Sequence, residues 1–308
     1  MVSPAGAAAS LSSPVVPGVC SSPPNATAVS VSGHCPLLAY QRYLDEPDVH
    51  VQTLNINTGV THNVGNPATV VQVPNDGPET TSSGSPSFSP AGNWIAYSSD
   101  APNPLGPGHI WLVRTDGTQN QQLTTGGGEG SPVFSGDGKY VYYTAQGASA
   151  SEGISLWRVN INSRQRQQIT HFPKSFGIYG LDRGGNEFAF TPLLSITAPI
   201  YTMSLNGTHV TAVPNTAGGQ MPHLNAAGNQ LIFYTPQGTA GIKTVHTDGS
   251  HLRNLTPGQN YLQPDWSRDG TLIAFIDAHQ NLFVARSNGS GISEVGAFGA
   301  VQHPVWQP

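Results

Sequence analysis

The chain has 308 residues and few charged side chains. Asp, Glu, Lys and Arg make up 9% of it, against roughly 25% in ordinary soluble domains, and the formal net charge is −5. Without a basic stripe, the chain lacks the footprint expected for nucleic acid or an anionic membrane. No stretch is long and apolar enough to span a bilayer. Gly (36), Pro (26) and small polar residues replace charge, which is typical of short strands joined by tight turns.

Cysteine is also scarce, because the chain has only Cys20 and Cys35. Two cysteines alone do not make a zinc site, so they form either a disulfide or two free thiols. The low charge and the Pro/Ser-rich surroundings favour an oxidising compartment and therefore the disulfide. That bond would close a loop of about 15 residues and add roughly 3 kcal/mol of stability.

The N-terminal segment, residues 1–35, is rich in Pro, Ala and Ser and has no sustained period. It lacks a basic region followed by an apolar core, so it is not an intact signal peptide. Its composition is typical of the start of a mature exported protein. We therefore expect a leader or strap before the folded domain and a secreted or periplasmic location.

From residue 36 onward the chain repeats itself. The phrase SPSFSPAGNWIAY at Ser85 returns as SPVFSGDGKYVYY at Ser131 and as QPDWSRDGTLIAF at Gln263. Self-similarity at about 44 residues marks stacked units that cannot bury their faces alone. The first hairpin glycine of each unit falls at Gly92, Gly138, Gly185, Gly228 and Gly270.

Each unit contains four short strands. A second turn with Asn or Asp follows the first, and these residues are preferred in tight hairpins. Alternating runs rich in aromatic and β-branched residues lie between the turns. Fourth strands are expected at 122–124, 168–170 and 254–256. The tryptophans recur at strand positions and are expected to pack between units: Trp94, Trp111, Trp157, Trp266 and Trp306.

Four strands per unit predict an all-β fold, a six-bladed β-propeller of four-stranded antiparallel blades. Five units run from about 84 to 296. Both ends of the domain supply the sixth blade, with residues 300–306 as its innermost strand and three strands beginning at Leu37 as the rest. Such a composite blade closes the ring and leaves no free sheet edge. The expected organisation is a leader at 1–35 and one propeller domain at 36–308.

The phrase Ser-Pro-x-Phe/Trp-Ser-Pro-x-Gly, an Ile-Ala-Tyr/Phe strand, an Asp-Gly turn and a closing Leu-Thr together resemble the TolB-like propeller repeat. The likeness is strong in the units beginning near 85, 131 and 263 and weaker near 178 and 222. The resemblance implies a six-bladed propeller. Similar propellers act as periplasmic protein-binding modules, as non-catalytic domains beside peptidases, and as oligogalacturonate lyases with a metal in the central channel. The fold alone therefore does not select a function.

Long loops and the channel mouth are the candidate sites. In a propeller the tight first and third turns share one face, and the loops at 44–48, 65–83, 100–108, 146–153 and 191–199 lie on the other, where function often sits. The innermost strands begin on that loop face, so their first residues ring the channel mouth: Ser85, Ser131, Tyr179, Gln220, Met221, His223, Gln263 and His303. The alternative is that the loops are tolerated insertions and that these side chains line a water-filled channel.

His223, Gln263 and His303 lie on three consecutive inner strands and form a candidate metal site. Neutral imidazole is a good transition-metal ligand, and a side-chain carbonyl can complete the shell. The resemblance to oligogalacturonate lyases, which hold their metal with His and Gln of inner strands, indicates the same positions. However, His223 follows its proline whereas His303 precedes its own, and 12 Lys and Arg are few for a lyase of anionic sugars.

Glu129 is expected at the channel mouth and is a weaker candidate ligand, for a cation such as calcium. It is a lone carboxylate within a glycine-rich segment. One carboxylate gives little support for a calcium site, because calcium takes six to eight oxygen ligands.

Two functions fit these observations. The first is an exported, non-catalytic propeller that binds a protein or neutral carbohydrate on its long-loop face, because uncharged Asn/Gln/Ser/Thr-rich loops suit neutral polar ligands. The alternative is a metal-dependent polysaccharide lyase or hydrolase with a divalent metal ion in the central channel. We favour the first, with no required cofactor, and expect a monomer.

Overall fold

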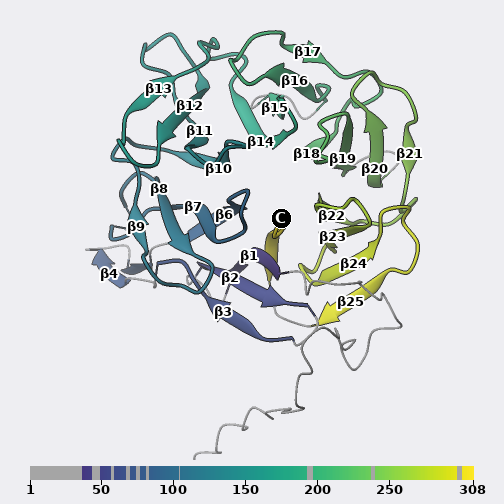
Figure 1. Cartoon of the computed structure of the whole chain (residues 1–308), viewed down its shortest axis with the longest axis horizontal. Helices are drawn as coiled ribbons and strands as arrows, with labels where there is room; N and C mark the ends of the chain where they lie inside the picture. Colours follow the sequence, from purple (N-terminus) through teal and green to yellow (C-terminus); the bar gives the residue numbers. More distant parts are fainter. Residues whose placement is uncertain are drawn as a thin grey trace, which may run out of the picture.

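The computed structural model describes residues 37–43, 49–56, 59–66, 70–73, 77–80, 83–103, 105–192, 197–236, 240–296 and 300–308. Strands in these ranges form six four-stranded sheets and one two-stranded sheet. Figure 1 shows the six larger sheets as blades around a central axis, which confirms the predicted propeller. The leader predicted at 1–35 and the Cys20–Cys35 disulfide lie outside the described residues.

Five blades consist of strands that follow one another along the chain, each strand antiparallel to its neighbour. Blade 2 comprises β6 (Ser83–Phe88), β7 (Trp94–Ser99), β8 (His109–Arg114) and β9 (Gln121–Gln122), and blade 3 comprises β10 (Gly130–Phe134), β11 (Tyr140–Gln146), β12 (Ile154–Asn160) and β13 (Arg166–Gln168). Blade 4 comprises β14 (Ile178–Gly184), β15 (Glu187–Pro192), β16 (Tyr201–Ser204) and β17 (Thr211–Ala212). Blade 5 comprises β18 (Gln220–Leu224), β19 (Gln230–Thr235), β20 (Gly241–His246) and β21 (Arg253–Asn254), and blade 6 comprises β22 (Leu262–Trp266), β23 (Leu272–Ile276), β24 (Leu282–Arg286) and β25 (Ser293–Gly296).

The remaining blade, the composite blade, joins both ends of the described chain. Its strand order is β26 (Val301–Trp306), β1 (Leu37–Tyr43), β2 (Val49–Asn55) and β3 (Thr61–Asn63). The C-terminal strand is innermost, as predicted, and the C-terminus lies near the centre of the ring in Figure 1. The ring is therefore closed by antiparallel pairing between β26 and β1.

The repeated phrase builds the first hairpin of each blade. In blade 2 the backbone N–H of Trp94 donates to the Ser89 hydroxyl at 3.0 Å, and Gly92 takes a φ of 70° that favours glycine. Ser135 in blade 3 and Ser267 in blade 6 accept the equivalent bonds from Tyr140 and Leu272. The serine and the glycine of the phrase thus specify the turn that separates the first two strands.

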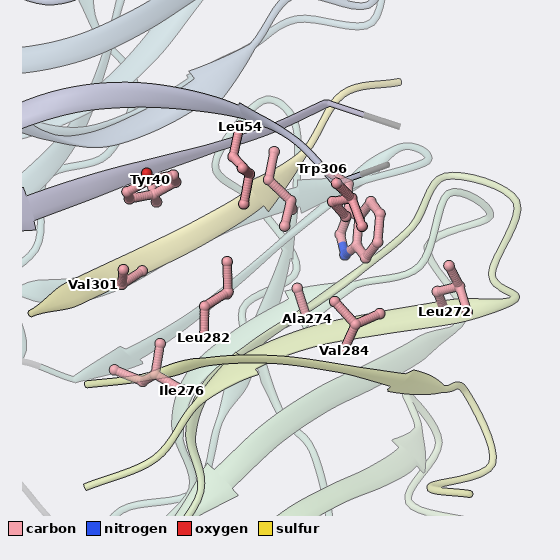
Figure 2. Close-up of a cluster of buried hydrophobic side chains, with 11 residues drawn as sticks. Tyr40, Leu54, Leu272, Ala274, Ile276, Leu282, Val284, Val301 and Trp306 are labelled. Carbon is pink, nitrogen blue, oxygen red and sulfur yellow. The ribbon is translucent and has the colours of Figure 1, made fainter. Parts of the chain in front are cut away.

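The core is divided among the boundaries between blades. Each of six clusters of buried side chains combines residues of two neighbouring blades. Figure 2 shows the cluster that joins the composite blade to blade 6, where Trp306 and Tyr40 lie opposite Leu282 and Val284. Trp266 and Trp306 are buried in such boundaries, and Trp94, Trp111 and Trp157 pack against them, as expected. Each blade is therefore stabilised mainly by its neighbours.

The fourth strands end earlier than the sequence indicated. We expected strands at 122–124, 168–170 and 254–256, but β9, β13 and β21 end at Gln122, Gln168 and Asn254. The closing threonine is the reason, because its hydroxyl takes over as acceptor: Ile110 N–H donates to Thr124 at 2.9 Å, and Leu156 N–H donates to Thr170 at the same distance. The Leu-Thr motif therefore terminates the ladder instead of extending it.

The segment expected to be the loop 65–83 contains an additional hairpin. Strands β4 (Val70–Val73) and β5 (Gly77–Thr80) pair antiparallel in a two-stranded sheet outside the blades. The three β-branched valines of Val-Val-Gln-Val explain the first of these strands. The described part of the chain offers no helix with the length and apolar character that a membrane crossing requires.

Candidate functional site in the central cavity

Each inner strand has one residue in the left-handed region of backbone space, next to a shift in its pairing register. These residues are Ser85 (φ 50°), Ser131 (φ 45°), Gly180 (φ 61°), Met221 (φ 46°), Gln263 (φ 49°) and His303 (φ 48°). In every blade except blade 4 the next residue is proline. Proline has no N–H to leave unpaired, so it suits a bulge in the ladder. The six bulge residues therefore form one equivalent set around the axis.

The inner strands enclose a cavity of about 490 Å³. All six bulge residues line it, as does Tyr179, whereas Gln220 does not. The wall continues along the inner strands to the tight-turn face, where Pro90, Gly136 and Arg268 lie. None of the described residues of the long loops lines the cavity. The cavity is thus built by the rigid inner strands, although the sequence placed the candidate site at the loop face.

Three ionisable side chains meet in the cavity wall. Nδ1 of His223 lies 3.2 Å from Oδ1 of Asp265 and 3.7 Å from Oδ1 of Asp182. The three residues occupy the same position, two after the bulge residue, on the inner strands of blades 4, 5 and 6. We call them the Asp–His–Asp cluster. His223 was predicted from the sequence as a site residue, whereas Asp182 and Asp265 were not.

Each aspartate also links two inner strands. Oδ2 of Asp182 accepts a hydrogen bond from the backbone N–H of Leu224 at 2.7 Å. Oδ2 of Asp265 accepts one from the backbone N–H of Trp306 at 3.0 Å. Both carboxylates are therefore fixed between a backbone donor on the next blade and the imidazole of His223.

The surroundings shift the pKa values of His223 and His303 in opposite directions. Burial lowers the pKa of His223, but the charges of Asp265 and Asp182 outweigh it and raise this pKa to about 9. Burial, together with the neighbouring positive charge on His223, lowers the pKa of His303 to about 4. Burial also raises the pKa of Asp182 above its usual value. At neutral pH His223 is therefore charged and His303 is neutral.

The three predicted metal ligands are brought to the same cavity, and two of them are in contact. Oε1 of Gln263 accepts a hydrogen bond from the backbone N–H of His303 at 2.7 Å. That carbonyl is therefore already engaged. Within the described residues, no group of three or more His, Cys, Asp or Glu side chains is arranged to hold a metal ion.

Solved structures with the same arrangement of blades identify the type of propeller. A TolB from Acinetobacter baumannii superposes with a TM-score of 0.68 at 18% identity, over 89% of this chain and 67% of that chain. The chain folds as a TolB-like propeller. A putative TolB from Agrobacterium tumefaciens gives a TM-score of 0.63 at 15% identity, over 85% of this chain and 90% of that one.

The TolB-like fold is shared with an enzyme as well. An oligogalacturonate lyase in complex with manganese matches with a TM-score of 0.50 at 14% identity, over 83% of this chain and 72% of that chain. No protein-family profile matches the sequence, and no curated protein sequence does. At these identities the likeness establishes the fold, and the function has to be argued from the site.

Glu129 lies elsewhere in this TolB-like propeller than the sequence indicated. It does not line the cavity but is buried beside blades 2 and 3, with Oε1 2.8 Å from Nη2 of Arg166. It also accepts a hydrogen bond from the Thr124 hydroxyl, and its Oε2 lies 3.6 Å from Nδ1 of His109. A buried carboxylate needs such partners. Its surroundings therefore explain it as an internal ion pair.

Proposed function

We propose that this TolB-like propeller is a non-catalytic binding module that holds a protein segment or a neutral carbohydrate at its central cavity. The observation that carries the proposal is the cavity of about 490 Å³ enclosed by six inner strands. Ligand pockets usually measure roughly 300–1,000 Å³ and are largely preformed. The long-loop face predicted from the sequence would then supply outer contacts to a larger ligand.

The chemistry of the cavity supports a neutral polar ligand. Its charged groups are occupied by one another or by backbone: His223 faces Asp182 and Asp265, and Nη1 of Arg268 donates to the Pro90 carbonyl at 3.0 Å. Around them lie the hydroxyls of serines and the amide of Gln263. Tyr179, 43% exposed, adds an aromatic ring with a polar tip at the wall.

An exported location accompanies this proposal. The low fraction of charged residues and the Ala/Ser/Pro-rich N-terminal segment support a periplasmic or secreted protein, and the TolB-like fold is in keeping with both. We propose that it works as a monomer without a required cofactor. Fractionation of the native host cells, with detection by a specific antibody, tests the location, and a cytoplasmic signal alone would contradict it.

A cavity-filling variant tests the binding site. Ser87→Trp places a large side chain in the cavity wall at a position with ordinary backbone geometry. The matched control is Ser163→Trp, which adds the same side chain to an exposed turn outside both the cavity and the long-loop face. Wild type and both variants are applied to an array of neutral and acidic oligosaccharides and to chemical cross-linking in extracts of the native cell envelope.

We expect one ligand, a neutral glycan or one cross-linked protein, to be bound by wild type and Ser163→Trp and lost in Ser87→Trp. A glycan signal identifies the carbohydrate ligand, and a cross-link with no glycan signal identifies the protein ligand. If Ser87→Trp has the melting temperature of wild type and keeps every interaction, the cavity is not the binding site.

A metal-dependent lyase or hydrolase is a second candidate, favoured by the orientation of His223. A metal-ligating histidine usually turns its other ring nitrogen to a carboxylate, and Nδ1 of His223 faces Asp265 in this way. His223, Gln263 and His303 would hold the ion, which would polarise a substrate oxygen when bound. Elemental analysis of untagged protein tests this proposal. A stoichiometric metal that is lost in both His223→Gln and His303→Gln would support it, and a metal content after incubation with manganese, zinc or calcium that is the same in wild type and both variants would refute it.

A further inference from the structure

In blades 2, 4 and 5 the third turn brings two side chains together on the outer part of the tight-turn face. The residue that ends the third strand lies beside the residue five positions later. In blade 2, Nε of Arg114 donates to Oε1 of Gln119 at 3.0 Å, and in blade 4 the Ser204 hydroxyl lies 3.4 Å from Nδ1 of His209. Gln119 and His209 have positive φ values, 53° and 56°. The left-handed backbone therefore directs the later side chain back toward the strand end.

In blade 5 both members of this pair are histidines. His246 ends β20, and His251 occupies the positive-φ position with φ 56°. Their rings are stacked, with centroids 4.5 Å apart and an interplanar angle of 30°. Nδ1 of His251 is hydrogen-bonded to the Ser250 hydroxyl at 2.9 Å, which leaves its Nε2 for another partner. His251 is exposed, so solvent ions reach this pair.

We propose that His246 and His251 form a two-imidazole binding site for a divalent transition-metal ion, such as Cu²⁺, Ni²⁺ or Zn²⁺, apart from the central cavity. Imidazole suits these ions, and affinity is expected to be highest for Cu²⁺. Because one short turn already holds the two imidazoles side by side, they lose little conformational entropy when they bind one ion. The pair should therefore bind a metal ion more tightly than two histidines far apart. A modest rotation of the exposed His251 side chain makes the two nitrogens converge on one ion.

The surroundings of the pair favour a cation. The Asp248 carboxylate interacts electrostatically with both imidazoles. Its Oδ1 accepts a hydrogen bond from the backbone N–H of Ser250 at 2.8 Å. The carboxylate therefore adds negative charge near the two imidazoles while the turn keeps its shape. Because no third His, Cys, Asp or Glu completes a cluster in the described part of the chain, water fills the remaining coordination positions.

The chain itself offers a matched control and a gain-of-function variant. Blade 4 has the same turn with Ser204 and His209, so it carries only one imidazole. Untagged protein is titrated with Cu²⁺, with calorimetry for stoichiometry and electron paramagnetic resonance for nitrogen ligation. The variants are His246→Gln, His251→Gln, His209→Gln and Ser204→His.

We expect wild type and His209→Gln to bind one Cu²⁺ with two nitrogen ligands at this turn. His246→Gln and His251→Gln should each weaken that binding by more than about tenfold. Ser204→His should create a second site in blade 4 and raise the stoichiometry by one. The proposal is refuted if wild type binds no Cu²⁺, or if Cu²⁺ binding is unchanged in both His246→Gln and His251→Gln.

Discussion

The carboxylate of Asp265 accepts a hydrogen bond from the backbone N–H of Trp306, with an N···O distance of 3.0 Å, across the boundary where the ring closes. Gln263, two residues before Asp265, makes a similar contact, because its side-chain carbonyl accepts a hydrogen bond from the backbone N–H of His303 at 2.7 Å. The last strand of the chain is thus held by side chains of blade 6 as well as by its ladder with β1. Closure of the propeller and the geometry of the cavity depend on the same residues.

Replacement of Trp306 by alanine should weaken this closure. The indole is 6% exposed and packs in the cluster shown in Figure 2. Loss of such a buried aromatic side chain costs about 3–5 kcal/mol of unfolding free energy, which urea denaturation measures. Ile292→Ala, at a position 38% exposed, should change stability by less than about 0.5 kcal/mol. Equal denaturation midpoints for the two variants would contradict the packing described for β26.

Restoring the repeated phrase in blade 4 should destabilise the protein. Gly184 stands where blades 2, 3 and 6 have serine, and a Cβ there would lie 2.4 Å from the Asn225 carbonyl oxygen and from Cβ of Leu224. Gly184→Ser should therefore cost about 1–3 kcal/mol through overpacking. Gly130→Ala is the control, because its Cβ would meet only the Thr144 hydroxyl at 3.7 Å. A Gly184→Ser protein as stable as wild type would show that blades 4 and 5 are not in this close contact.

Stability should fall on the alkaline side because of His223. The pKa of this imidazole is raised from 6.5 to about 9 in the folded protein, so the folded state binds the proton more tightly than the unfolded state. The resulting stabilisation is fully present below pH 6.5 and is lost as pH rises through about 9. Chemical denaturation from pH 6 to 10 should show this loss in wild type and a flatter profile in His223→Gln. Superimposable profiles would rule out the ion pairs with Asp182 and Asp265.

His303 should produce the opposite slope on the acid side. Its pKa falls from 6.5 to about 4 in the folded protein, so the unfolded state binds the proton more tightly. Stability should therefore decrease as pH falls from 6.5 toward 4, and His303→Gln should reduce that decrease. His279→Gln, at a side chain 86% exposed, is the control. An unchanged acid slope in His303→Gln would mean that this imidazole is not buried beside His223.

The blade architecture could be predicted because its signals are local. Ser85 and the proline that follows it occupy a bulge, and Ser89 and Gly92 specify the hairpin that comes next. These residue types return at the same spacing in other repeats. The composite blade could be predicted as well, because the three strands that begin at Leu37 lack an innermost strand unless the C-terminal strand supplies it. The early ends of the fourth strands were missed, because the threonine hydroxyl competes with a backbone acceptor only once the strands are adjacent.

The site was predicted less completely, since it depends on contacts between blades. Asp182 and Asp265 could have been found by aligning the repeats. Both occupy the position two residues after the bulge, which is the position of His223 in the blade between theirs. By contrast, nothing local indicates that Glu129 turns away from the axis to pair with Arg166, a residue from the outer strand of blade 3. The metal role of His223, Gln263 and His303 stays a prediction.

The bulge residues also bear on how such a protein diversifies. Six equivalent places on the cavity wall carry Ser, Ser, Gly, Met, Gln and His in one molecule, with nearly the same backbone angle at each. The register shift, with a proline in five of the six blades, sets the chain direction at these places, so the fold tolerates different side chains there. Mutation can therefore exchange five of these groups one at a time without rebuilding the scaffold, whereas the Gln263 side chain also holds the last strand through the His303 N–H. New ligand preferences are accessible through single substitutions, and a library randomised at these positions alone would explore them.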